Sequence, residues 1–188
     1  MAIPLPLAIA AYCTYLAAWL VIAIAAVVGA IPRLRGQVAA TTWLTAPVIF
    51  GTLLQVAAAF AVTRSMGSGP LRPGRYEVAG VVVLASFAAV LFLWALLSVP
   101  QGVDSHQLVT EGAYAWLRHP IYLAFLSMLV ATGLLVSSRI KLILPVILYV
   151  AGTELRIASE EEELTEKFRD SYMQYKRRTR WRYLPGLR

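Results

Sequence analysis

Residues 117–127 read "LRHPIYLAFLS", where an arginine and a histidine stand directly before a proline and a long apolar run. Proline is tolerated at the first position of a helix, because its missing N–H would have no partner there anyway. Charged groups at the edge of a hydrocarbon layer are costly unless they have a partner or a function. The stretch therefore predicts a membrane helix that begins next to Pro120, with Arg118 and His119 at its polar boundary.

The composition around this stretch is that of a membrane protein. The chain has 188 residues, 59% of them hydrophobic and 14% charged, with a mean hydropathy of +0.67. Soluble domains carry about 25% charged residues. The length suits a single domain over residues 1–188. The first 30 residues lack a basic n-region and form an apolar run too long for a signal peptide, so we expect a retained first span.

Five apolar runs are candidates for crossing a bilayer, which takes about 20 apolar residues per helix. The last two runs are separated only by "SRIK" at residues 138–141. One continuous helix would put Arg139 and Lys141 in the middle of the membrane, so a tight helical hairpin is favoured. The predicted fold is an all-α, polytopic membrane protein with about five transmembrane helices. The runs cover about residues 8–31, 45–62, 78–99, 121–137 and 140–157.

The predicted domain has two parts. Residues 1–99 hold three N-terminal spans, and residues 100–188 hold a loop, the helical hairpin and a C-terminal helix. Of the 17 Lys and Arg residues, 12 fall on the side of the C-terminus and nine of those lie from Arg156 onward. The positive-inside rule places this side in the cytoplasm. A basic tail beside a membrane predicts contact with anionic lipid, and nucleic acid is disfavoured because no recognition motif accompanies the charge.

The loop before the hairpin and the tail after it are predicted to meet. Two antiparallel helices with a short connection bring their far ends together, so His119 should lie near Arg156 and Glu160. In the tail, apolar and aromatic side chains recur on one helical face. We expect an amphipathic helix against the cytoplasmic face of the membrane. Its stripe consists of Leu164, Phe168, Tyr172 and Tyr175.

Several of these features have simpler explanations. Arg118 could extend to a lipid phosphate, with His119 as an interfacial polar residue. Arg156 and Glu160 could form an ordinary i,i+4 pair on a surface helix. The acidic run at residues 160–163 would usually be mostly solvated. Three aromatic side chains could form an interfacial belt, namely Tyr114, Trp116 and Tyr122.

Other classes of site have little support. The single cysteine, Cys13, excludes an internal disulfide and a cysteine-based metal cluster, and in an apolar run it is expected to be a small packed residue. Two histidines thirteen residues apart do not have a metal-ligand spacing, so no metal is expected. No nucleophile elbow of a serine hydrolase is present.

Two separated motifs resemble the isoprenylcysteine carboxyl methyltransferase family. They are "HQLVTEGAYAWLRHPIY" at residues 106–122 and "RIASEEEELTEKFRDSYMQYKRR" at residues 156–178, with the hairpin between them. The family pattern has Leu-Val-Thr, Gly-x-Tyr and Arg-His-Pro-x-Tyr, then Arg, two adjacent Glu, Leu, Phe-Gly and Tyr-x-x-Tyr. The match covers about residues 104–178. Ala124 and Arg169 stand where the family has glycines.

The resemblance implies S-adenosylmethionine as the methyl donor and a cytoplasmic site that is not of the Rossmann type. It assigns Arg156 to the carboxylate of the substrate, which makes Arg156 and Glu160 the expected catalytic pair. The residues that it assigns to the cofactor are His106, Gln107, Leu108, Val109, Tyr114, His119, Pro120, Ile121, Tyr122 and Glu160.

The chemistry agrees with this assignment. A carboxylate acceptor is ionised at neutral pH and needs no general base, but it needs a cation, and the planar guanidinium of Arg156 can bind both of its oxygens. The expected reaction is methyl transfer to a prenylated cysteine or a similar lipid-tailed carboxylate. Alternative acceptors are a phospholipid amine, a thiol or a phenolic isoprenoid. A non-catalytic lipid-binding protein is the alternative from another class.

Overall fold

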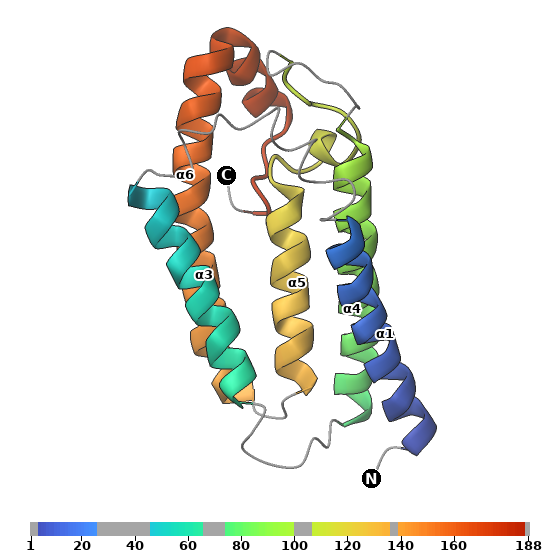
Figure 1. Cartoon of the computed structure of the whole chain (residues 1–188). Helices are drawn as coiled ribbons and strands as arrows, with labels where there is room; N and C mark the ends of the chain where they lie inside the picture. The colour runs from blue at the N-terminus through green and yellow to red at the C-terminus, as the bar shows by residue number, and fades with distance from the viewer. Residues whose placement is uncertain (1–3, 26–45, 66–73, 100–106, 136–138, 187–188) are drawn as a thin grey trace.

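A computed structural model describes residues 4–25, 46–65, 74–99, 107–135 and 139–186 (Figure 1). Every regular element within these ranges is a helix, so the all-α prediction is confirmed for them. The helices are α1 (Leu5–Ala25), α3 (Ala46–Ser65), α4 (Arg75–Leu97), the short 3-10 helix η4 (Gly112–Ala115), α5 (Pro120–Leu135) and α6 (Arg139–Arg178).

Within the described residues, each predicted apolar run falls on one helix, while residues 26–31 and 136–137 of two runs lie outside the described ranges. In the part of the chain that the structure describes, three helical segments are long and apolar enough to cross a membrane, namely Pro6–Ala25, Arg75–Leu97 and Leu142–Arg178. Two shorter apolar segments are Ala46–Val62 and Pro120–Leu135. Large apolar side chains point outward from these helices, including Phe50, Phe60 and Leu97. Such a surface suits hydrocarbon rather than water. The chain is a membrane protein.

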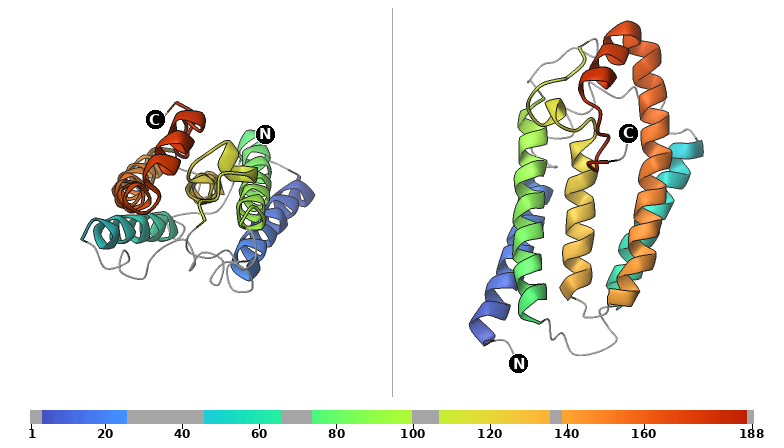
Figure 2. Two further views of the ribbon diagram at one scale, coloured as in Figure 1. Left: turned by 90° about the horizontal axis from the view of Figure 1, so that it is seen from above. Right: turned by 180° about the vertical axis from the view of Figure 1, so that it is seen from behind.

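The helices form a curved row in the order α1, α4, α5, α6, α3 (Figure 2). The five long helices of the described ranges alternate in direction in the order α1, α3, α4, α5, α6, and α5 and α6 form the predicted antiparallel hairpin (Figure 1). The start of α5, η4 and the distal part of α6 therefore gather at one end of the bundle, which we call the cap. Cys13 does not fit its prediction, because it is exposed on α1 rather than packed.

The contact between α3 and α6 is unusually close. A methyl group added to Gly51 would lie 2.5 Å from the carbonyl oxygen of Gly152, and one added to Gly152 would meet the carbonyl oxygen of Gly51. Small residues at helix crossings in membranes let two backbones touch in this way. The first half of α3 is thereby pressed against α6 directly below the cap.

The distal part of α6 is not the unbroken helix that the sequence predicts. Arg169 has φ 45° and ψ −119°, so the helix bends there. Beyond the bend, Tyr172 and Tyr175 turn inward and are buried. The chain then returns toward the bundle, where the fully buried Tyr183 packs with residues of α5 and α6. Residues 179–186, which we call the C-terminal segment, thus fasten the cap to the helical hairpin.

Candidate active site

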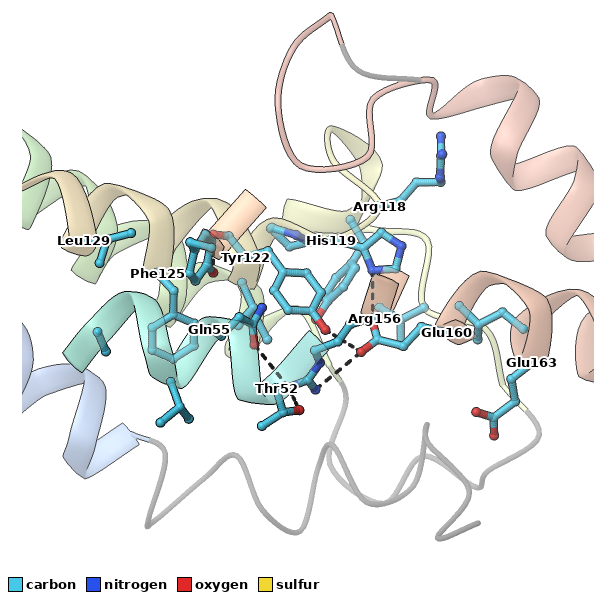
Figure 3. A pocket seen from close by; sticks show the side chains of 18 of the residues that line it. Thr52, Gln55, Arg118, His119, Tyr122, Phe125, Leu129, Arg156, Glu160 and Glu163 are labelled. Carbon is cyan, nitrogen blue, oxygen red and sulfur yellow. Dashed lines mark hydrogen bonds and ion pairs between the residues drawn. The ribbon is translucent and has the colours of Figure 1, made fainter. Parts of the chain in front are cut away.

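A cavity of about 690 Å³ opens beneath the cap, with walls from α1, α3, α5, α6 and residues 107–119 (Figure 3). Arg156 and all the predicted cofactor residues that the structure describes line it. Those cofactor residues are Gln107, Leu108, Val109, Tyr114, His119, Pro120, Ile121, Tyr122 and Glu160. His106, the remaining predicted residue, lies outside the described ranges. Their proximity is confirmed, while their roles stay predictions.

Glu160 is the centre of the polar end of this cavity. The hydroxyl of Tyr122 donates a 2.5 Å hydrogen bond to its Oε1, and an Arg156 nitrogen lies 3.6 Å from the same oxygen. Nδ1 of His119 lies 3.5 Å from the other oxygen, Oε2. The hairpin therefore brings His119, Arg156 and Glu160 together as the sequence predicted, and Figure 3 shows all three beside Tyr122.

The charges at this end support one another. Burial alone would lower the pKa of His119, but the carboxylates of Glu160 and Glu161 outweigh burial and hold that pKa above its ordinary value. Burial would raise the pKa of Glu160, but His119, Tyr122 and Arg156 hold it below its ordinary value. His119 precedes α5, and Glu160 lies beyond the fifth predicted span at residues 140–157, in the part of α6 that belongs to the cap. Their charged forms are favoured where the cap meets the membrane.

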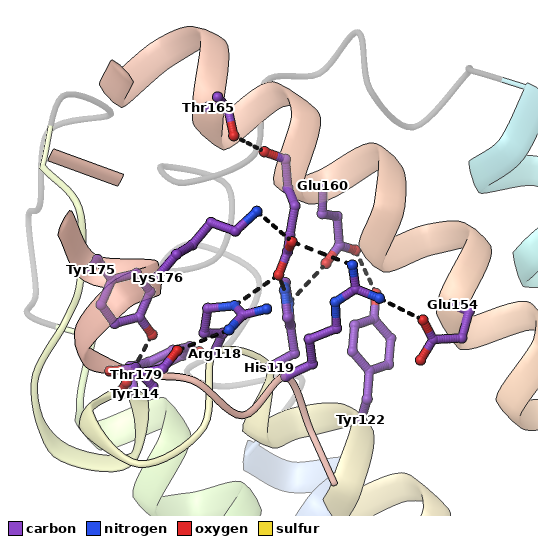
Figure 4. A network of polar contacts seen from close by, with 12 residues as sticks. Tyr114, Arg118, His119, Tyr122, Glu154, Glu160, Thr165, Tyr175, Lys176 and Thr179 are labelled. Carbon is purple, nitrogen blue, oxygen red and sulfur yellow. Dashed lines mark hydrogen bonds and ion pairs between the residues drawn. The ribbon is translucent and has the colours of Figure 1, made fainter. Parts of the chain in front are cut away.

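Arg118 does not extend to lipid phosphate, because its side chain is buried within the cap. Its Nε lies 2.8 Å from Oε1 of Glu161, and its NH1 group donates to the carbonyl of Thr179 at 2.8 Å. Lys176 and Arg182 approach the other oxygen of Glu161 at 3.1 and 3.7 Å. Figure 4 shows Arg118 and Lys176 turned toward this network. The expectation of a mostly solvated acidic run misses Glu161, which is 5% exposed.

Main-chain hydrogen bonds also hold the Arg-His-Pro motif to the C-terminal segment. The backbone N–H of Arg118 donates to Trp181 at 3.0 Å, and that of His119 donates to Arg182 at 2.8 Å. The hydroxyl of Tyr175 donates to the carbonyl of Tyr114 at 2.7 Å. The motif, the distal part of α6 and the C-terminal segment are therefore joined at one wall of the cavity.

A second wall comes from α3, and the sequence reasoning missed it. Thr52 and Gln55 line the cavity and both contact Arg156. The signal was available, because polar side chains in an apolar span usually face the interior of a bundle or a polar cavity. Thr52 and Gln55 are three residues apart and hence on one helical face.

The lower part of the cavity is apolar and lies deep among the helices. Val56, Ala59, Phe125 and Leu129 line it. From Tyr122 to Thr132 along α5 is about 15 Å at 1.5 Å per residue, or about half of a 30 Å hydrocarbon core. A hydrogen bond of 2.8 Å between the hydroxyls of Tyr15 and Thr132 lies at this depth. One cavity thus joins a charged end to a long apolar arm.

With this geometry established, comparison with known proteins gives a direct result. The model of the isoprenylcysteine carboxyl methyltransferase (ICMT) family matches residues 78–166. This segment matches the ICMT family. It contains most of α4, all of α5, the Arg-His-Pro motif, Arg156 and Glu160. The resemblance predicted from the sequence is confirmed for this ICMT segment.

Individual proteins that resemble the ICMT segment are protein-S-isoprenylcysteine O-methyltransferases. The protein-S-isoprenylcysteine O-methyltransferases of Schizosaccharomyces pombe and Saccharomyces cerevisiae are each 36% identical over 73 residues. These matches cover 39% of this chain and 31% and 30% of the two relatives. The human protein of that name is 32% identical over 75 residues, which is 40% of this chain and 26% of that protein. The matched part of the chain thus spans less than a third of each relative.

Proposed function

We propose that this chain is a membrane methyltransferase that uses S-adenosylmethionine to methylate the carboxylate of a prenylated cysteine or a similar lipid-tailed acceptor. One observation carries the proposal most directly: a single cavity holds the polar motif residues at one end and an apolar arm among the helices at the other. Such a cavity can hold the charged end of a substrate at its polar end and the apolar end of the same substrate in its apolar arm.

The polar end fits the methyl donor. A volume of about 690 Å³ lies within the usual size range of small-molecule sites, about 300–1,000 Å³. The carboxylate of Glu160 can accept hydrogen bonds from amino or ribose groups, and the aromatic rings of Tyr114 and Tyr122 line the same space and can attract a sulfonium cation. When bound, S-adenosylmethionine would supply a methyl group that is already activated.

The remaining task of the protein is to position the acceptor. An ionised carboxylate needs no general base, so the chain has to hold an acceptor oxygen in line with the methyl group and keep water away. Arg156 lies at the junction of the polar end and the apolar arm, between α3 and Tyr122. From there its guanidinium can bind the carboxylate while the lipid tail occupies the arm beside Phe125 and Leu129.

We further propose that the chain crosses the membrane five times, with the cap in the cytoplasm. The alternating directions of the five long helices support this topology (Figure 1). The excess of Lys and Arg on the cap side supports the orientation. A cytoplasmic cap gives the site access to a soluble methyl donor and to lipid-tailed acceptors in the inner leaflet.

The test is methyl transfer from labelled S-adenosylmethionine by the full chain in detergent, with a prenylcysteine analogue, a phospholipid amine, a thiol and a phenolic isoprenoid as acceptors. Methylation of the prenylcysteine analogue is the expected result. Arg156→Lys should keep the affinity for S-adenosylhomocysteine but lose about a hundredfold in rate, because lysine keeps the charge without the planar fork. Transfer to another acceptor alone, or a fully active Arg156→Lys enzyme, would contradict the proposal.

A further inference from the structure

Arg156 is oriented by a helix outside the segment that matches the family. Its NH1 group donates to Oγ1 of Thr52 at 3.3 Å and to Oε1 of Gln55 at 3.4 Å, and both acceptors belong to α3. The ICMT segment begins only at residue 78. The part of the chain that precedes it therefore contributes directly to the surroundings of the proposed carboxylate-binding residue.

The two α3 side chains are fixed as acceptors by other hydrogen bonds. The hydroxyl of Thr52 donates its proton to the carbonyl of Val48 at 2.7 Å, so toward Arg156 it can only accept. The amide nitrogen of Gln55 donates to Oγ1 of Thr153 at 3.0 Å, which turns its amide oxygen toward Arg156. Both groups are thus oriented toward the guanidinium by bonds that do not depend on it.

The contact of Gly51 with Gly152 sets the distance between these groups. A methyl group on Gly51 would lie 2.7 Å from Cγ of Arg156 as well as 2.5 Å from the Gly152 carbonyl. Any larger residue would push α3 away from α6 and displace the arginine. The two glycines bring Thr52 and Gln55 within hydrogen-bonding distance of a side chain on the opposite helix.

Further contacts of the guanidinium come from other directions. The Tyr122 ring on α5 lies 5.6 Å from the carbon Cζ of Arg156, and Glu160 on α6 lies 3.6 Å from NH2. Thr52 and Gln55 are neutral, so they hold the guanidinium without cancelling its charge. A carboxylate at either α3 position would compete with an acidic ligand for the same cation.

From this geometry we infer that Thr52 and Gln55 are positioning residues that orient Arg156 toward the carboxylate of the acceptor. The inference rests on the proposed function and extends it to α3. Discrimination between a carboxylate and a neutral acceptor then depends on this pair, because a guanidinium binds a carboxylate well only when its fork faces both oxygens.

The experiment uses the full chain in detergent and the variants Thr52→Val, Gln55→Leu and their double mutant. Each single variant should raise the KM for a prenylcysteine acceptor by about tenfold, the lower range for a hydrogen bond to a charged group. The affinity for S-adenosylhomocysteine should not change. In the double variant, the preference for the carboxylate acceptor over its neutral amide analogue, measured by competition, should fall by at least tenfold.

Two further variants separate orientation from general stability. Thr52→Ser keeps the hydroxyl and should restore the KM of the native chain. Thr14→Val removes a comparable hydroxyl, which bonds to the carbonyl of Ala10 on α1, and should leave the KM unchanged. A double variant with native KM and native carboxylate preference would overturn the inference. Absence of any transfer by the unaltered chain would instead overturn the proposed function, and the positioning role with it.

Discussion

At the scale of single residues, two adjacent glutamates have different main partners, although His119 lies between them. Glu160 faces the cavity and contacts Tyr122, whereas Glu161 faces the C-terminal segment and contacts Arg118. The two ring nitrogens of His119 lie 3.5 Å from one oxygen of each glutamate. Consecutive helical residues point about 100° apart, so neighbours can serve different walls. Glu160 therefore belongs to ligand binding in our proposal, and Glu161 holds the cap together.

The first prediction separates Glu160 from its neighbours. Glu160→Gln keeps the size of the side chain but removes its charge, so the affinity for S-adenosylhomocysteine should fall about ten- to a hundredfold, as for the loss of a charged hydrogen bond. Titration calorimetry in detergent measures it. Glu162→Gln is the matched control, because Glu162 is exposed on the same turn and should have no effect. Equal affinities of the two variants would exclude Glu160 from the donor site.

The second prediction concerns pH. The pKa of His119 is raised in the folded state, so between its ordinary value, about 6.5, and its folded value the native protein binds more protons than the unfolded chain. Stability should therefore be full below about pH 6.5 and fall as the pH rises through the folded pKa. Glu160 and Glu161 have lowered pKa values, so their contribution is lost only in acid.

The measurement is the unfolding temperature of the full chain between pH 6 and 9. His119→Asn should remove the decline with rising pH, because asparagine does not titrate. If the unfolding temperature of this variant still fell with rising pH, the proton would belong to another group. There would then be no basis for a protonated His119 in the folded protein.

At the scale of elements, the bend in α6 explains a departure from the family pattern. Arg169 stands where the family pattern has glycine, and its φ of 45° lies in a region that residues with a Cβ rarely adopt. Residues held in such conformations cost about 1–3 kcal/mol each. The bend turns Tyr172 and Tyr175 into the cavity wall, so the strained backbone has a structural purpose.

The third prediction follows from this bend. Arg169→Gly should stabilise the chain by about 1–2 kcal/mol and leave the affinity for S-adenosylhomocysteine unchanged, since glycine adopts positive φ without the Cβ clash. Thermal unfolding in detergent is the readout. Asp170→Gly is the control, because the next residue is also exposed but lacks the positive φ, and glycine in a helix costs about 1 kcal/mol. A lower unfolding temperature for Arg169→Gly would refute the strain.

The elements also show what the sequence could predict. Apolar runs and the "SRIK" break defined the helices, and the hairpin alone placed His119 beside Glu160. The packing of α3 against α6 could not be predicted, because a pattern of apolar residues does not specify which helices pack together. The Gly51–Gly152 contact that joins them is visible only in the folded structure. The contacts of Thr52 and Gln55 with Arg156 depend on that contact.

The acidic run shows the same limit on a smaller scale. Four consecutive glutamates look alike in the sequence, and only the fold shows that Glu161 is surrounded by cations from the Arg-His-Pro motif, the end of α6 and the C-terminal segment. Contacts within one helix can be predicted from the spacing of residues, as for Arg156 and Glu160. Contacts that form only because the chain turns back after Arg169 cannot be predicted in this way.

At the scale of the whole molecule, a network of charged side chains gathers in and beside the cap, at one end of the bundle. Glu160, Glu161, Arg118 and Arg156 are all in the cap or at its border, while outward-facing apolar side chains cover the helices. This asymmetry gives the molecule a defined position in a bilayer, with the cap at one interface. The proposed acceptor, which has one charged and one apolar end, has the same polarity as the molecule.

The fourth prediction tests whether the cap lies on the cytoplasmic side of the membrane. In a Cys13→Ala background, which contains no cysteine, one variant carries Glu162→Cys in the cap and another carries Tyr76→Cys at the start of α4, where the side chain is 89% exposed. Lys and Arg are retained preferentially on the cytoplasmic side. A membrane-impermeant maleimide added to intact cells should therefore label the cysteine at position 76 and spare that at position 162. In inside-out vesicles the pattern should reverse. Labelling of position 162 in intact cells would place the cap outside and remove the cytoplasmic methyl donor from the proposal. Labelling of both positions from the same side would contradict an odd number of membrane crossings between residues 76 and 162.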